Sequence, residues 1–116
     1  MTGKECYEIM KGDYDDVLSR LRTDERIKKF LMRVPDDTSF VELCNALEKK
    51  DLESAFRAAH TLKGVSKNLS LSNLAYSSSN LTEALRGRTE YGDDIEPLFK
   101  KVKNDYALTI ACIQML

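Results

Sequence analysis

The chain has 116 residues, enough for one domain with a buried core, and we expect residues 1–116 to form a single domain. Its 18 Lys and Arg residues nearly balance its 19 Asp and Glu residues, which argues against a nucleic-acid binder because such proteins are usually strongly basic. No apolar run approaches the roughly 20 residues that span a bilayer, and the first residues lack the apolar stretch of a signal peptide. We therefore expect a cytoplasmic protein that binds neither nucleic acid nor membrane.

The three cysteines, Cys6, Cys44 and Cys112, are far apart in the sequence, and none belongs to a Cys-x-x-Cys pair. We interpret them as buried reduced thiols, because a buried free Cys behaves as a small hydrophobic residue. A redox or metal role is the alternative. Since the chain has a single His, a zinc site would need most of these cysteines gathered together. We expect no metal site and no cofactor.

The first third of the chain is predicted to be helical, because apolar residues recur at spacings of three and four and do not alternate. Helices are expected over residues 13–21 and 24–34. Pro35 should stop the second helix, since a residue before proline avoids helical geometry. For residues 1–12 the sequence fits both a peripheral helix and a frayed segment.

Four longer helices of about 12 to 22 residues are predicted in the rest of the chain, each preceded by a side chain that can accept first-turn N–H groups. These capping residues are Ser39 with Glu42, Asp51 before residues 52–69, Ser70 or Ser72, and Asp93 with Glu96. Residues 87–92 form a polar loop before the last helix. Long helices with short connections are typical of a bundle. The predicted fold is all-α, an antiparallel four-helix bundle with one or two additional N-terminal helices.

Ser77, Ser78 and Ser79 form a run inside a helical pattern. We interpret the run as a place where small side chains allow two helices to pack closely. A phosphoserine site is the alternative.

The helix over residues 52–69 carries the candidate reactive side chains. On a helical wheel at about 100° per residue, its apolar and small residues form one stripe, and His60 lies roughly 120° from the middle of that stripe. We therefore expect His60 at the solvent border. Lys63 and Lys67 follow on its side of the helix, and Gly64 stands four residues after it.

These residue types suit phosphoryl transfer. Imidazole is a competent nucleophile near neutral pH, and the ammonium group of Lys63 can reach the phosphate oxygens, while Lys67 adds longer-range attraction. Gly64 costs the helix about 1 kcal/mol relative to Ala, but it leaves room for a phosphoryl group and for a partner's backbone. Taken singly, each observation has an ordinary explanation, since a lone helical His is usually a surface residue and a helical Gly can mark tight packing. The combination is less easily accidental.

The run His60-Thr61-Leu62-Lys63-Gly64 matches the His-x-Leu-Lys-Gly signature of histidine-containing phosphotransfer domains. The chain resembles this family over about residues 13–116, and most specifically over 51–84. The flanking segments that carry the resemblance are Asp51-Leu52-Glu53, Asn68-Leu69-Ser70-Leu71-Ser72-Asn73-Leu74 and Leu81-Thr82-Glu83-Ala84. Three residues depart from the pattern, with Lys67 in place of a small residue, Ser70 in place of Gly and Thr82 in place of Glu.

The resemblance implies a four-helix bundle, phosphorylation on His60, and exchange of the phosphoryl group with an aspartate on receiver domains of response regulators or hybrid histidine kinases. The chain has no Gly-rich nucleotide loop and no kinase motif set. We therefore expect a monomeric phosphoryl carrier without ATP-dependent kinase activity. The divalent metal for transfer should come from the receiver.

The docking surface is expected at the apolar border around His60. Its residues are Phe56 and Leu71, rimmed by Arg57, Lys63 and Lys67. The alternative from another functional class is a helical adaptor that binds signalling partners without carrying phosphate. Loss of the His or the Lys would be its mark in the sequence, and both are present. A metal-binding or hydrolytic enzyme is less well supported, because the single His lacks metal ligands at suitable spacing.

Overall fold

The structure, a computed structural model, describes all residues from 1 to 116 and contains seven α-helices, one 3₁₀ turn and no β-strand. The predicted all-α class is confirmed. In chain order the elements are α1 (Gly3–Met10), α2 (Tyr14–Leu21), α3 (Asp24–Leu31), η1 (Val34–Asp36), α4 (Ser39–Glu48), α5 (Leu52–Asn68), α6 (Ser72–Leu85) and α7 (Ile95–Gln114). None of the helices combines the length and the apolar character needed to cross a membrane.

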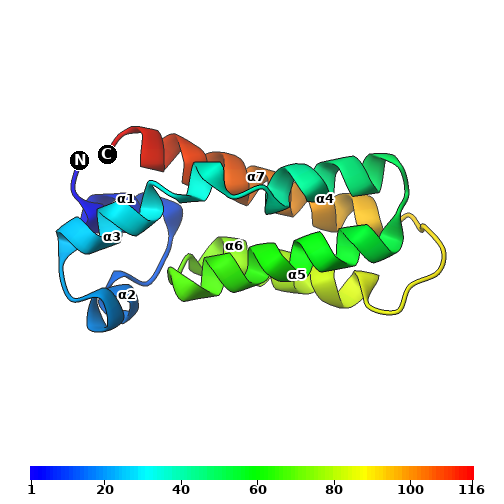
Figure 1. Cartoon of the computed structure of the whole chain (residues 1–116), viewed down its shortest axis with the longest axis horizontal. Coiled ribbons are helices and arrows are strands. Elements are labelled where there is room, and N and C mark those ends of the chain that lie inside the picture. The colour runs from blue at the N-terminus through cyan, green and yellow to red at the C-terminus, as the bar shows by residue number, and fades with distance from the viewer.

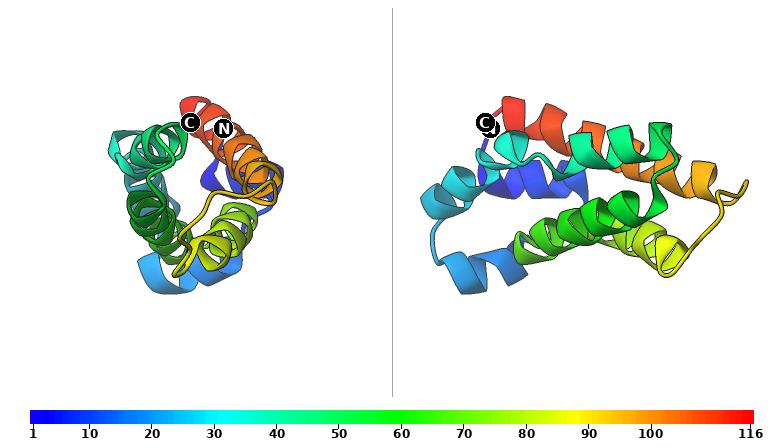
Figure 2. Two further views of the ribbon diagram at one scale, coloured as in Figure 1. Left: turned by 90° about the vertical axis from the view of Figure 1, so that its right-hand side faces the viewer. Right: turned by 45° about the vertical axis from the view of Figure 1, so that its right-hand side comes forward.

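Helices α4 to α7 form the antiparallel four-helix bundle that the sequence predicts (Figure 1). Helix α5 packs between α4 and α6, and α6 packs on α7. Phe40 of α4 stacks on Tyr106 of α7, with ring centroids 4.0 Å apart and planes 6° from parallel. This contact closes the ring of four helices, which Figure 2 shows end-on. The molecule is elongated along the bundle axis and measures 44 × 23 × 20 Å.

Small buried side chains lie on both α5 and α6, which pack against each other. Helix α5 buries Ala59 and Ser66, and α6 buries Ser77 and Ser78, all of them at most 2% exposed. Ser79 is half-buried. The interpretation of the serine run as a packing feature is confirmed for Ser77 and Ser78, because burial keeps their hydroxyls from a modifying enzyme.

Three short helices precede the bundle, where the sequence predicted one or two, because residues 1–12 also contain a helix. The hydroxyl of Thr2 accepts the N–H of Glu5 at 3.1 Å, and the Glu5 carboxylate accepts the N–H of Thr2 at 3.0 Å, which caps α1. Helix α1 packs against α7, and its buried Tyr7 donates its hydroxyl to the carbonyl of Leu69 at 2.6 Å. These contacts fix α1 to the bundle, at the end where both termini lie (Figure 2).

The turn after α5 places Ser70 in the left-handed backbone region, with φ of 53°, which residues with side chains rarely adopt. Its hydroxyl donates to the carboxylate of Asp16 at 2.6 Å and accepts from Arg20 at 2.8 Å. Arg20 also donates to the carbonyl of Asn68 at 2.7 Å, at the end of α5. The predicted capping of α6 by Ser70 or Ser72 is wrong, because α2 binds the Ser70 hydroxyl and α6 begins without a side-chain cap.

The capping box predicted from Ser39 and Glu42 does not form. Helix α4 begins at Ser39, whose N–H donates to the carboxylate of Asp37 at 2.9 Å and whose hydroxyl donates to the same group. A carboxylate is the stronger acceptor because it is charged. The hydroxyl of Thr38 donates to Glu42 at 3.3 Å. Helix α3 also ends earlier than predicted, at Leu31, because the chain then enters the proline-containing 3₁₀ turn.

Helix α5 begins as predicted, since the Asp51 carboxylate accepts a first-turn N–H. The box predicted from Asp93 and Glu96 does not form, because α7 begins after Asp94 and lacks a side-chain cap. Both carboxylate oxygens of Asp94 bind the guanidinium of Arg88, at 2.6 and 2.8 Å. This ion pair ties the loop before α7 to the start of that helix.

The three cysteines are free thiols, as the sequence indicated. Cys6 and Cys112 are buried, and Cys44 is half-buried. Burial raises the pKa of the Cys6 thiol to about 12. Because the thiolate is the reactive form, Cys6 is a packing residue near neutral pH.

Candidate functional site

His60 lies at the middle of α5 and is exposed to solvent, as its position on the helical wheel predicted. The opposite face of α5 lies in the core, where Ala55, Ala59 and Leu62 are at most 1% exposed. No ion pair within the chain involves His60. The core therefore holds the helix in place while the imidazole stays accessible to a partner.

Gly64, one turn after His60, faces open space. A Cβ atom built on Gly64 would meet no heavy atom within 4 Å. No neighbouring helix or loop therefore requires glycine there, and the packing explanation for this residue does not hold. Glycine in a helix interior costs up to about 1 kcal/mol relative to Ala. Because Gly64 has no side chain, the surface one turn after the imidazole is open.

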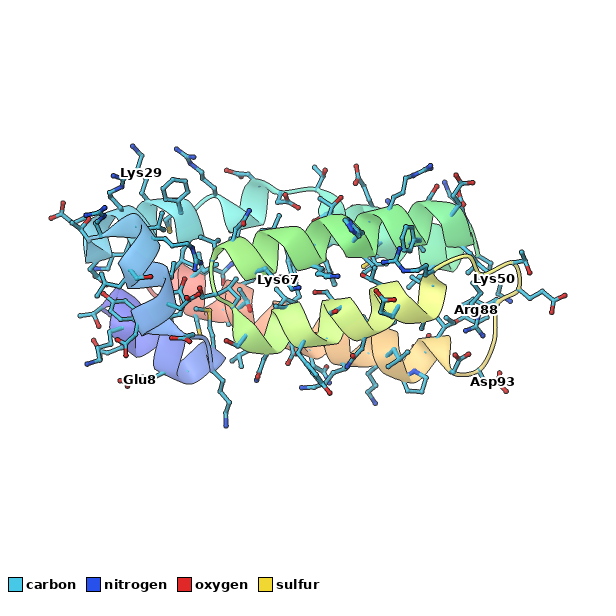
Figure 3. The ribbon with its side chains drawn as sticks, turned by 90° about the horizontal axis from the view of Figure 1, so that it is seen from below. Glu8, Lys29, Lys50, Lys67, Arg88 and Asp93 are labelled. Atoms are coloured by element: carbon cyan, nitrogen blue, oxygen red, sulfur yellow. The ribbon has the colours of Figure 1, made fainter.

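Two lysines follow His60 on the same face of α5. Lys63 is half-buried and Lys67 is exposed. Neither forms an ion pair within the chain, so both ammonium groups are available to an incoming anion. Figure 3 shows Lys67 on the face where α5 and α6 run side by side.

An aromatic ring lies next to His60 on the side toward the start of α5, and an ion pair lies against that ring. The ring centroid of Phe56 lies 6.0 Å from that of His60, and the two planes meet at 42°. Arg86, just after α6, places its guanidinium carbon 5.0 Å from the Phe56 ring centroid. The same guanidinium donates to both carboxylate oxygens of Glu83, at 3.0 and 3.1 Å. These side chains form a continuous row from α5 to α6.

The carboxylate of Glu83 lies within the electrostatic reach of the site. Hydrogen bonds from Arg86 hold the pKa of Glu83 below its usual value, and the positive charges of Lys63 and of protonated His60 act in the same direction. Glu83 is therefore ionised near neutral pH. It brings a second negative charge to this surface, where the exposed Glu53 already forms an ion pair with Arg57 at 3.0 Å.

The sequence did not identify Glu83 and Arg86 as site residues. Their place beside His60 depends on how α6 packs on α5, which a helical wheel of α5 alone does not contain. The available signal was the spacing of three between Glu83 and Arg86, which places an acid and a base on one face of the neighbouring helix.

One expected docking residue is not at the surface. Leu71 is 1% exposed, so its predicted place in the docking surface is wrong. The N–H of Leu71 donates to the carbonyl of Ser66 at 2.9 Å, which folds the turn back onto α5 and directs the Leu71 side chain into the core. Phe56 is half-buried and Arg57 is exposed, so both present surface to a partner.

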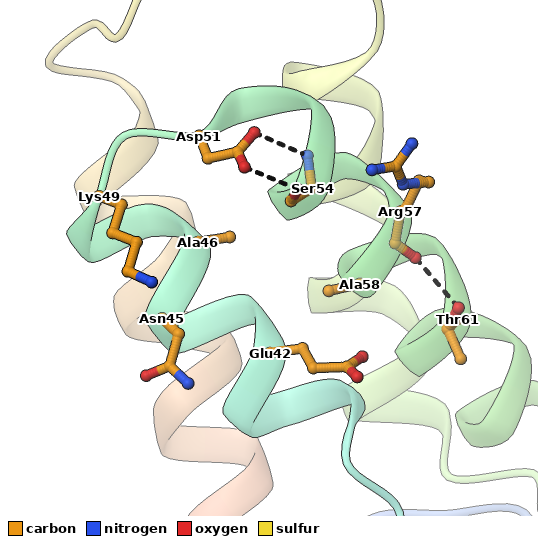
Figure 4. Close-up of a pocket in the computed structure, with 9 residues that line it drawn as sticks. All are labelled: Glu42, Asn45, Ala46, Lys49, Asp51, Ser54, Arg57, Ala58 and Thr61. Carbon is orange, nitrogen blue, oxygen red and sulfur yellow. Dashed lines mark hydrogen bonds between the residues drawn. The ribbon is translucent and has the colours of Figure 1, made fainter.

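The molecular surface around His60 contains no pocket. Three hollows occur on the protein, and none is lined by His60, Lys63 or Gly64. One of them, about 410 Å³ in volume, lies between α4 and α5 and has Arg57 and Thr61 at its edge (Figure 4). His60 therefore lies on an open, convex part of the surface.

The comparisons with known proteins agree with this geometry. The family model of the Hpt domain matches residues 27–111. The match begins inside α3, covers α4 to α6 and most of α7, and leaves α1 and α2 outside. Neither the curated proteins nor the solved structures contain a match.

Proposed function

Because the chain belongs to the Hpt domain family, whose members are phosphoryl carriers for histidine phosphotransfer in two-component signalling and not kinases, we propose that His60 is the phosphoryl acceptor of this protein. The observation that carries the proposal is that the chain has a single histidine, and this residue is exposed in the middle of α5 beside the open space at Gly64. A family reaction that needs a histidine therefore has one candidate here.

In the proposed reaction, a lone pair of the His60 imidazole attacks the phosphorus of an aspartyl phosphate on a receiver domain. The P–N bond forms as the P–O bond to the aspartate breaks, and the aspartate leaves as a carboxylate. The reverse reaction returns the phosphoryl group, so no further reactant is needed. Because the protein forms no covalent bond beyond this one, catalysis consists mainly of positioning and charge compensation.

Lys63 is proposed to compensate the charge on the phosphoryl oxygens. Its ammonium is unpaired in the free protein, and a charge-assisted hydrogen bond is worth about 1.5–3 kcal/mol. Gly64 leaves the clearance that the phosphoryl group and the partner's backbone need. The divalent metal for transfer is proposed to come from the acidic pocket of the receiver, and the protein itself is proposed to need no cofactor.

The proposed partners are receiver domains of response regulators or hybrid histidine kinases, bound by the protein as a monomer. Phe56 supplies the apolar part of the docking surface, and Arg57 and Lys67 supply its charged rim. The site carries its histidine on an open surface, which complements a receiver whose aspartate lies in a pocket. A transient complex of this kind should bury little surface.

The test is phosphoryl transfer from a phosphorylated receiver domain, followed by intact-mass measurement. Lys63→Ala should slow transfer about 10- to 100-fold, at about 1.4 kcal/mol per tenfold. Lys29→Ala is the matched control, because Lys29 is likewise outside any ion pair but lies at an exposed position on α3, away from His60 (Figure 3). Equal transfer rates in the two variants would remove Lys63 from the mechanism. Binding of the receiver without any transfer would favour the adaptor function.

A further inference from the structure

The ion pair between Glu83 and Arg86 lies next to Phe56, the aromatic neighbour of His60. Both side chains are exposed, with 57% of the Glu83 side chain and 53% of the Arg86 side chain accessible to solvent. An exposed pair of this kind contributes little to stability. Its position matters more, since Arg86 packs over Phe56, which in turn packs against His60.

Phosphorylation changes the electrostatic balance of this row of side chains. A phosphoryl group adds about −1.5 to −2 charges and three acceptor oxygens near neutral pH. The carboxylate of Glu83, whose pKa the charge of Lys63 helps to lower, would then be repelled by the negative phosphoryl group on His60. The guanidinium of Arg86 would face a stronger acceptor than the carboxylate, because its planar fork binds phosphate oxygens in pairs.

We propose that Glu83 and Arg86 form a phosphate-responsive pair, in which Arg86 binds Glu83 while His60 is free and turns toward the phosphoryl group once His60 carries it. Arg86 can make this change by rotating its side chain, since about half of that side chain is exposed and its guanidinium lies on the Phe56 ring that adjoins the imidazole. The inference rests on the proposed function of His60 and adds two positioning residues to it.

The pair has a consequence for the free energy of the phosphorylated protein. Glu83 competes with the phosphoryl group for Arg86 and also repels it, so Glu83 raises the free energy of the phosphorylated protein. Arg86 lowers that free energy. The two residues together keep the phosphoryl group bound loosely enough to pass on, which a carrier needs. Loss of Glu83 and loss of Arg86 should therefore have opposite effects on the phosphorylated state.

The experiment measures the acid dissociation constant, and hence the pKa, of the phosphoryl group on His60. The full chain is phosphorylated with phosphoramidate, the donor is removed, and the phosphorus NMR signal is followed against pH. Glu83→Gln should lower the pKa of the phosphoryl group, because a negative neighbour that favours protonation is lost and Arg86 is released. Arg86→Gln should raise it. Removing one exposed unit charge near the phosphoryl group should change the acid constant about two- to fivefold.

The double variant separates a coupled pair from two independent charges. If Arg86 leaves Glu83 for the phosphoryl group, the effect of Glu83→Gln should be smaller when Arg86 is replaced by Gln, so the two shifts are not additive. Arg86→Lys should retain part of the effect of Arg86. The other charged groups of this surface stay unchanged in all variants: Lys63, Lys67, and the ion pair of Arg57 with Glu53.

Glu8→Gln is the matched control, because it removes the same charge from an exposed position on α1, at the far end of the molecule (Figure 3). Additive shifts, shifts of equal sign, or shifts no larger than that of Glu8→Gln would overturn this inference while leaving the proposed function intact. Failure of the unchanged chain to take up phosphate would overturn the proposed function, and the inference with it.

Discussion

Replacing Gly64 by Ala tests whether the open space beside His60 serves transfer. A Cβ atom at this position would meet no heavy atom within 4 Å, so the added methyl causes no clash in the free protein. The helix should gain about 0.8–1.0 kcal/mol, the difference in propensity between Ala and Gly. For a chain of this size, that gain should raise the melting temperature by about 3–6 °C.

The same methyl should impair phosphoryl transfer. Side chains four residues apart on a helix have Cβ atoms about 5–6 Å apart, so the methyl added in Gly64→Ala would border the imidazole at the place where phosphoryl oxygens and a receiver must fit. If the methyl displaces the phosphoryl group or the receiver and so raises the activation free energy of transfer by about 1.4 kcal/mol, transfer would slow about tenfold. A bulkier residue, as in Gly64→Gln, should slow it further. The variant is therefore expected to be more stable and less active.

The assay pairs thermal unfolding with transfer rate on the same preparations. Gly12→Ala is the matched control, because a Cβ atom there would lie 2.7 Å from a ring carbon of Tyr7 and 2.9 Å from the carbonyl oxygen of Ser70. That variant should be less stable and should transfer normally when folded. If Gly64→Ala instead lost stability and transferred normally, Gly64 would be a packing residue and the clearance argument would be refuted.

Two further predictions concern the turn after α5 and the contact between α2 and α3. Ser70→Ala should lower the free energy of unfolding more than Ser70→Gly does. Both variants lose the hydrogen bonds to α2, but only Ala retains the cost of a positive φ. Urea denaturation of both variants checks this order, and equal losses of stability would contradict it. The hydroxyl of Tyr14 donates to Asp24 at 2.6 Å, which raises the pKa of Tyr14 to about 12 and lowers that of Asp24. Since Tyr14 has a raised pKa in the folded state, its contribution to stability should be complete below its ordinary pKa of about 10 and disappear as the pH rises through about 12. Asp24 has a lowered pKa, so its contribution should be present above about pH 4 and disappear as the pH falls through the folded value. Unfolding measured against pH should show both losses. Tyr14→Phe should reduce the alkaline loss, while the loss from buried groups with raised pKa values, such as Cys6 and Tyr7, remains. An unchanged alkaline loss in that variant would count against the assignment.

The residues that the sequence placed correctly depend on local geometry. The exposure of His60 and its spacing from Gly64 follow from the period of one helix, and the hydrophobic stripe of α5 fixes which face is buried. Asp51 is likewise a local cap, since it bonds to the first turn of its own helix. These features could be predicted because each requires only neighbours in the sequence.

The residues that the sequence misplaced depend on contacts between distant segments. Ser70 could not be recognised as a partner of α2, because Asp16 and Arg20 approach it only in the folded chain. The same limit applies to Leu71, which the turn directs inward, and to Glu83, which reaches the site only through the packing of α6 on α5. Tertiary contacts decided the outcome at each of these positions.

The central claim is that His60 carries the phosphoryl group, and intact-mass measurement after incubation with phosphoramidate tests it most directly. The unchanged chain should gain one phosphoryl group, lose it in acid and keep it in base, as a phosphoramidate bond does. His60→Gln should gain none while its melting temperature stays nearly unchanged, because the residue lies at the surface. Labelling that persists in His60→Gln, or a label that survives acid, would contradict the account.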